Sequence, residues 1–117
     1  RIPERFAAGR RDPRTGEIGF SENLNPHLAW SDLPPGARSL VLVCHDFDVP
    51  SSGESVNKSD REIPSDLPRI DFFHWLLVDL APREGEIAEG AFSRGFTPRG
   101  KPGPEVEVAG FPGARQG

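Results

Sequence analysis

The chain has 117 residues, a length typical of a single domain, so we expect one domain over residues 1–117. Eighteen acidic residues exceed fourteen basic ones, and the formal net charge of −4 excludes the strongly basic surface of a nucleic-acid-binding protein. One cysteine excludes an internal disulfide, and no apolar run approaches the roughly 20 residues that would cross a bilayer.

The N-terminal third predicts short strands separated by turns. Glycine and proline number thirteen each, which is typical of a protein rich in loops. A weak edge strand is expected near "EIGF", residues 17–20, and a second short strand at Leu28 and Trp30, which alternate between two proline-containing turns. His27 lies in the first of these turns, and we interpret it as a solvated histidine. The tripeptide 57–59 matches the N-glycosylation sequon, which we attribute to chance.

Two apolar runs predict the main strands, at about residues 39–47 and 72–80. Both are rich in β-branched or aromatic residues, and both faces of the first are largely apolar, so we expect it to be covered on both sides. Residues 51–71 hold almost no apolar periodicity and predict a long flexible loop. Residues 93–117 predict a second loop, because ten of the twenty-five are glycine or proline. These features predict a mainly β fold with long loops and little helix.

Acidic side chains at the end of the first strand raise the question of what they face. Asp46 lies on the opposite face of the strand from His45, and His74 lies near the start of the second strand. If the two strands are neighbours, Asp46 can reach His74. A carboxylate stabilises a protonated imidazole, whose second N–H can then bind an anion such as a phosphate ester.

Three other interpretations of these residues stay open. The first is structural: Asp46 and Asp48 cap the end of a strand, and His74 is a core histidine whose ring nitrogens are hydrogen-bonded within the protein. The second is a metal site made of His45, Asp46, Asp48 and His74, although His45 and Asp46 point to opposite faces. The third is a triad of Cys44, His74 and Asp46, although a thiol inside an apolar run is expected to stay neutral and inert.

The blocks "NPHLAW", "DLPPGARSLVLVCHDFDVP" and "DFFHWLLVDL" together resemble the phosphatidylethanolamine-binding protein family, which includes the Raf kinase inhibitor proteins, and in particular its bacterial branch. The resemblance implies a β-sandwich with a large central sheet, antiparallel or mixed. It also implies a pocket for phosphate-like anions. By position, the family's Asp-Pro-Asp-x-Pro motif falls on residues 46–50, its histidine on His74, and its aromatic wall on Phe72. The implied ligand-binding residues are Asp46, Asp48, Val49, Pro50, Phe72 and His74.

The chain departs from the family pattern in two ways. Phe47 stands where the motif has proline, which restores an N–H and lets the strand continue further. The family also continues with a Gly-Pro-Pro type loop and a His-Arg-Tyr strand that are not in this sequence. We therefore expect this chain to be the N-terminal portion of a fuller domain, with Gly117 not its natural end. Its open strand edges would then pair with that C-terminal part or with a second copy of the chain.

The function that the resemblance implies is binding of a small anion, either phosphate or a phosphorylated headgroup. The alternative is a protein that regulates or inhibits a kinase or a protease, with the 51–71 loop meeting the partner. A third hypothesis is phosphoester hydrolysis, but we expect no enzyme, no cofactor and no metal, because the residues supply no activated nucleophile or metal cage. The single cysteine favours the cytoplasm; a periplasmic or secreted location is the alternative, since the sequence begins at Arg1 rather than at methionine.

Overall fold

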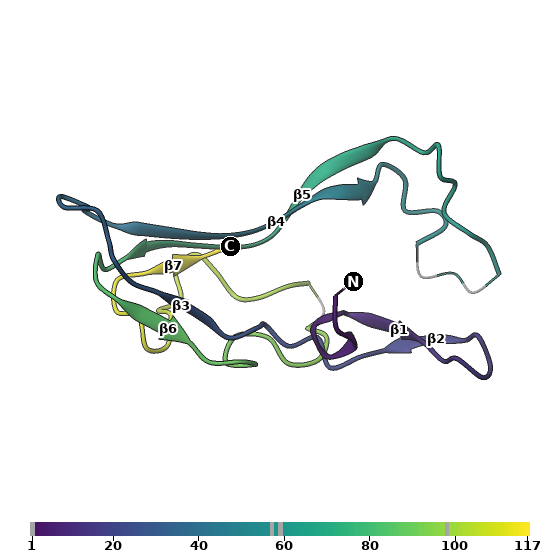
Figure 1. Ribbon diagram of the computed structural model, residues 1–117, viewed down its shortest axis with the longest axis horizontal. Coiled ribbons are helices and arrows are strands. Elements are labelled where there is room, and N and C mark those ends of the chain that lie inside the picture. Colours follow the sequence, from purple (N-terminus) through teal and green to yellow (C-terminus); the bar gives the residue numbers. More distant parts are fainter. Residues whose placement is uncertain (1, 57, 59, 98) are drawn as a thin grey trace. The chain divides into compact units, whose positions relative to one another are not determined.

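A computed structural model describes residues 2–56, 58, 60–97 and 99–117, and it is mainly β (Figure 1). The elements in order are a 3₁₀ turn η1 (Glu4–Phe6) and strands β1 (Gly9–Arg11), β2 (Ile18–Phe20), β3 (Leu28–Trp30), β4 (Leu40–Pro50), β5 (Arg69–Leu80), β6 (Gly85–Ile87) and β7 (Arg115–Gln116). They form three sheets with the orders β1-β2, β3-β6 and β4-β5-β7. The predicted mainly β fold is confirmed. In the described residues, no helix has the length and apolarity needed to cross a membrane.

The chain divides into two units, of which the first comprises Arg1–Ala29, Pro50–Pro68 and Glu86–Pro98. Its hairpin pairs β1 with β2 antiparallel, with Gly9 opposite Phe20. Asp12 holds the turn, because its carboxylate accepts the backbone N–H groups of Arg14 and Thr15 at 2.7 and 3.2 Å. These two hydrogen bonds hold the pKa of Asp12 below its ordinary value. Asn57 and Ser59 of the sequon lie outside the described residues.

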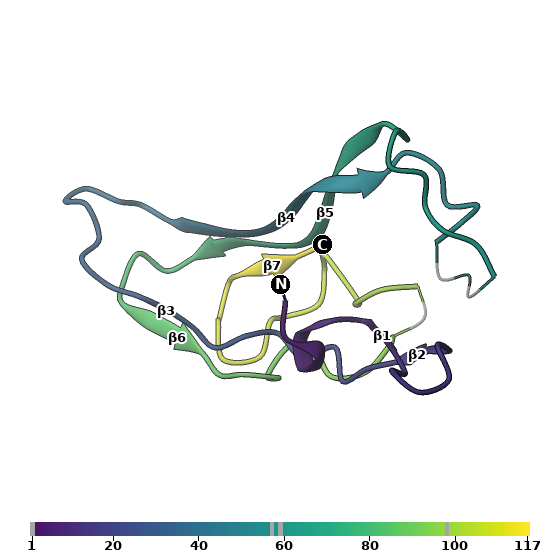
Figure 2. The same ribbon diagram turned by 45° about the vertical axis from the view of Figure 1, so that its right-hand side comes forward.

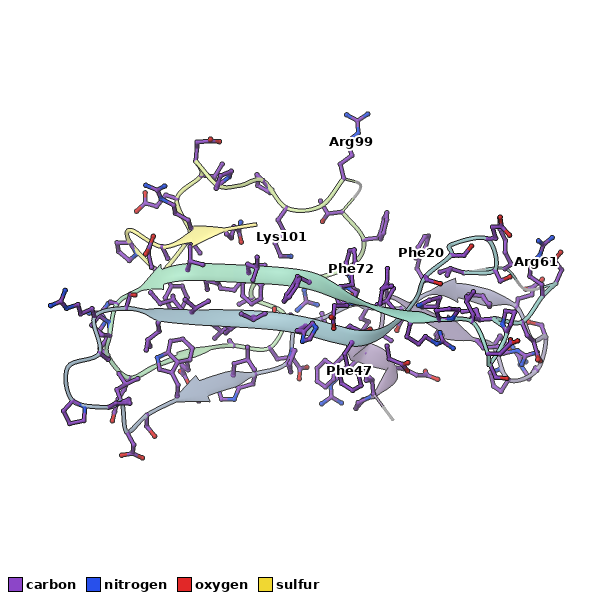
Figure 3. All side chains as sticks on the ribbon, turned by 90° about the horizontal axis from the view of Figure 1, so that it is seen from above. Phe20, Phe47, Arg61, Phe72, Arg99 and Lys101 are labelled. Atoms are coloured by element: carbon purple, nitrogen blue, oxygen red, sulfur yellow. The ribbon has the colours of Figure 1, made fainter. Side chains whose placement is uncertain are left out.

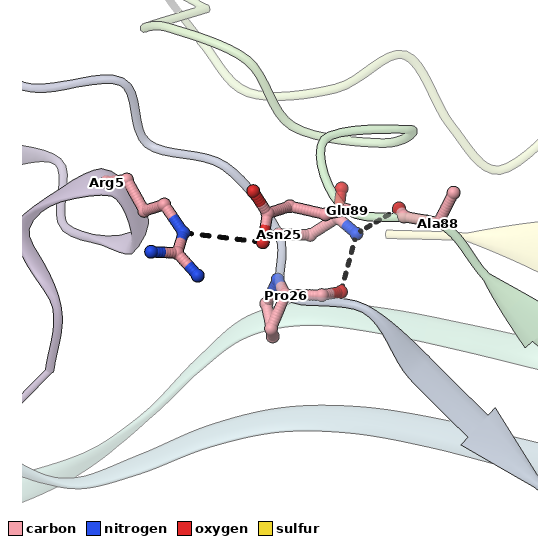
Figure 4. A network of polar contacts seen from close by, with 5 residues as sticks. All are labelled: Arg5, Asn25, Pro26, Ala88 and Glu89. Atoms are coloured by element: carbon pink, nitrogen blue, oxygen red, sulfur yellow. Dashed lines mark hydrogen bonds and ion pairs between the residues drawn. The ribbon is translucent and has the colours of Figure 1, made fainter.

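A buried asparagine ties distant segments of the first unit together. Asn25 is only 9% exposed, and its amide group donates to the carbonyl oxygens of Pro26 and Ala88 at 2.9 and 3.0 Å (Figure 4). Its side-chain oxygen accepts the N–H groups of Phe92 and Ser93 at 2.8 and 3.0 Å. All four hydrogen-bonding positions of the amide are therefore used, which satisfies the buried group.

The second unit comprises Trp30–Val49, Arg69–Gly85 and Arg99–Gly117, and it holds the sheet β4-β5-β7. β4 and β5 run beside each other as a long ribbon, and β7 lies along β5 (Figures 1 and 2). The β5 and β7 strands are antiparallel, with Leu77 opposite Gln116. The buried apolar side chains of this unit are Trp75, Leu77, Leu80, Val108 and Ala114. The second half of β5 thus supplies most of its core.

The two main strands are longer and more exposed than the sequence predicts. β4 continues to Pro50, and β5 begins at Arg69, so residues 69–71 of the predicted loop are strand. The expectation that β4 is covered on both faces is wrong here, since Val41 and Val43 are 59% and 46% exposed. Cys44 is also exposed, although it lies within the apolar run of β4. Pairing with β5 satisfies the backbone of β4 but does not cover its faces, and within the described residues the face that carries Val41 and Val43 stays largely exposed.

Candidate functional site

The predicted pair of Asp46 and His74 is brought together across β4 and β5. Asp46 Oδ2 lies 3.6 Å from His74 Nε2, which is an ion-pair contact and too long for a hydrogen bond. The side chains are 44% and 51% exposed, respectively. The pair therefore lies on an open surface of the ribbon, where both side chains are in contact with water.

The second oxygen of Asp46 is held by its own strand. Asp46 Oδ1 accepts the backbone N–H of Asp48 at 2.8 Å. This hydrogen bond is the main reason that the pKa of Asp46 lies below its ordinary value of 3.8. Partial desolvation raises the pKa, and the nearby His74 lowers it further. Asp46 thus presents a fixed, ionised carboxylate to the imidazole of His74.

An aromatic side chain borders the histidine. The ring centroids of Phe72 and His74 are 4.9 Å apart at an interplanar angle of 65°, an edge-on contact. Phe72 is 49% exposed, so it forms a partly open apolar wall beside the imidazole. Figure 3, which looks down on the strands, shows Phe72 beside β5 and Phe47 beside β4. Val49 and Pro50, the other two predicted residues, are half-buried and end β4.

The strands also carry a second pair of this kind, which the sequence did not lead us to expect. His45 Nε2 lies 2.8 Å from Asp71 Oδ1, and the His45 ring stacks on Phe73 at 4.8 Å between centroids and 17° between planes. Because successive residues of a strand point to opposite faces, His45 lies on the other side of β4 from Asp46. The sequence places Asp71 in the predicted loop, and only the start of β5 at Arg69 brings it into the strand beside β4.

Arg69 is a further charged residue that the sequence did not single out. Its Nε atom lies 3.7 Å from Asp48 Oδ1, so the carboxylate of Asp48 forms an ion pair with the guanidinium of Arg69. The sequence places Arg69 in the predicted loop, and only its position at the start of β5 brings it opposite Asp48.

Other ligand sites find little support in the described part of the chain. There, no group of three or more His, Cys, Asp or Glu side chains is arranged to hold a metal ion, and His45 pairs with Asp71 instead of joining Asp46. Two surface hollows are lined by other residues, the first around Glu105, Glu107 and Arg115 and the second around Arg11, Lys58 and Arg61. Neither hollow includes Asp46 or His74.

Comparisons with known proteins agree with the blocks seen in the sequence. A family model described as phosphatidylethanolamine-binding protein matches residues 1–113. UPF0098 protein YbhB of Escherichia coli K12 is 30% identical over 75 residues, which cover 64% of this chain and 36% of the relative. A UPF0098 protein of Chlamydia trachomatis is 34% identical over 86 residues, covering 74% of this chain and 48% of the relative. One of Methanothermobacter thermautotrophicus is 26% identical over 100 residues, covering 86% and 47%.

The matched part of the chain therefore spans about half or less of the length of these relatives. The search of solved structures finds no significant match.

Proposed function

The chain belongs to the phosphatidylethanolamine-binding protein family, and from that premise we propose that it binds small phosphate-like anions at Asp46 and His74. The observation that carries the proposal is the 3.6 Å contact between Asp46 and His74, with both side chains about half exposed. A protonated imidazole carries two N–H groups. Since Nε2 faces Asp46, Nδ1 is left as the donor for a phosphate oxygen.

The surrounding residues would give this donor its charge and its specificity. The ionised Asp46 is a negatively charged partner for the imidazole of His74, and the N–H of Asp48 fixes the carboxylate in place. Phe72 supplies an apolar surface beside the bound anion, which suits a phosphate ester with an organic group better than a free inorganic ion. No bond is made or broken in this scheme, so the proposed role is binding.

Calorimetry with inorganic phosphate and with phosphoethanolamine tests this function. His74→Ala should weaken the binding of both by about tenfold or more, because it removes a charge-assisted hydrogen bond.

The chain offers a matched control in His45. The variant His45→Ala removes a histidine that also pairs with an aspartate, but on the opposite face of β4. It should bind both anions as the unchanged protein does. Equal affinity of the His74→Ala variant and the unchanged protein would refute the proposed function. Tighter binding of phosphoethanolamine than of phosphate would support a role for Phe72.

A second candidate function is a regulator that binds another protein, such as a kinase or a protease. The observation that favours it is the exposure of apolar side chains on β4 and β5, which is greatest at Phe47, with 76% of the residue exposed, Val41, with 59%, and Phe73, with 56%. Here the 51–68 segment would help to contact the partner. A pull-down from cell lysate should lose the partner when residues 51–66 are deleted, whereas anion binding should survive; retention of the partner would argue against this function.

A further inference from the structure

A row of three successive polar contacts connects Arg69 to His74 through Asp48 and Asp46. The guanidinium lies 3.7 Å from Asp48, the Asp48 N–H donates to Asp46 at 2.8 Å, and Asp46 lies 3.6 Å from His74. Each step of this set is in the second unit. The set therefore connects two basic side chains through two carboxylates.

The charges of these four residues matter for any anion that binds to His74. Asp48 is the more exposed of the two carboxylates, with 72% of its side chain accessible against 44% for Asp46. With His74 protonated, His74 offsets Asp46, and Arg69 offsets Asp48. Without Arg69, an anion at His74 would meet an uncompensated carboxylate on the neighbouring strand, and the repulsion would oppose binding.

We propose that Arg69 is a positioning residue of the anion site, which acts by neutralising and orienting Asp48. This inference rests on the proposed function and adds a residue to it. Arg69 also anchors the side chain of Asp48. The backbone N–H of Asp48 in turn holds the Asp46 carboxylate, which faces His74.

A series of four variants, measured by calorimetry with inorganic phosphate at low ionic strength, tests the proposal. Arg69→Gln should weaken binding by about five- to tenfold, because an exposed carboxylate then repels the anion. Arg69→Lys keeps the charge and should retain most of the affinity. The double variant Arg69→Gln/Asp48→Asn removes both charges and should bind phosphate more tightly than Arg69→Gln alone, because no uncompensated carboxylate remains. Arg61→Gln is the control, since it removes the same charge from a separate exposed pair with Asp60.

The outcomes separate the inference from the function on which it rests. Failure of the unchanged protein to bind phosphate would overturn both. Binding by the unchanged protein with no loss in Arg69→Gln, or a loss equal to that of Arg61→Gln, would overturn the inference alone. A double variant as weak as Arg69→Gln would also overturn it, because Arg69 would then contact the anion itself instead of acting through Asp48. Rescue by Asp48→Asn is a result that a purely structural role of Arg69 would not produce.

Discussion

Asp46 makes two contacts from two separate oxygen atoms, and this arrangement explains why it stays ionised. One oxygen accepts the N–H of Asp48, and the other faces His74. A backbone N–H does not titrate, so it favours the carboxylate at every pH at which the strand is intact. The pKa of Asp46 is lowered chiefly for this reason.

The lowered pKa gives a pH dependence of known sign. Because the folded pKa of Asp46 lies below the ordinary value of 3.8, Asp46 contributes stability that is fully present above that value. The contribution is lost as the pH falls through the folded pKa. Carbon NMR of the carboxyl group should show a titration midpoint below 3.8. Asp48→Ala keeps the N–H donor and should keep a low midpoint, whereas Asp48→Pro removes the donor and should raise it; an unperturbed midpoint in the unchanged protein would contradict the prediction.

Single residues show what the sequence could and could not predict about the site. The partnership of Asp46 and His74 was predictable, since a carboxylate and an imidazole on adjacent strands attract each other. The roles of Arg69 and Asp71 were not, because both depended on how far β5 extends toward the preceding loop. An arginine and an aspartate among other charged residues carry no periodicity that would place them in a strand.

At the scale of elements, long apolar strands were predicted and short strands were mostly missed. β4 and β5 contain runs of β-branched and aromatic residues, which is a strong strand signal. β6 and β7, with the sequences "GEI" and "RQ", have almost none, and pairing with β3 and β5 defines them. The extension of β4 through Phe47 to Pro50 follows the expectation that Phe47, unlike a proline, leaves the strand free to continue.

Gly85 in β6 is needed because an aromatic ring occupies the space of its missing side chain. A Cβ atom at Gly85 would lie 2.7 Å from Cζ2 of Trp30, whose Nε1 donates to the carbonyl oxygen of Arg83 at 2.9 Å. Gly85→Ala should therefore lower the free energy of unfolding by about 1–3 kcal/mol through overpacking, measured by urea denaturation. Gly19→Ala in β2 is the control, since nothing lies within 4 Å of the position that its Cβ would occupy. Equal stability of the two variants would contradict this account.

At the scale of the molecule, composition predicted the class of fold but not the distribution of exposed surface. The high glycine and proline content agrees with a loop-rich β protein. Burial is a property of the assembled layers, however, and no local pattern reveals whether a covering layer is present. Val41 and Val43 belong to a strand that was expected to be covered on both sides, and in the described residues they are exposed on one face of it.

The two histidine–aspartate pairs connect the same two strands, but the strand that supplies the histidine differs between them. β4 contributes the histidine to one pair and the aspartate to the other, and β5 contributes the complementary residues. If β4 slipped by one position along β5, the side chains would exchange faces and both attractions would vanish together. The two ion pairs on this ribbon therefore also help to set the register of β4 against β5, because a register shifted by one residue would lose both of them.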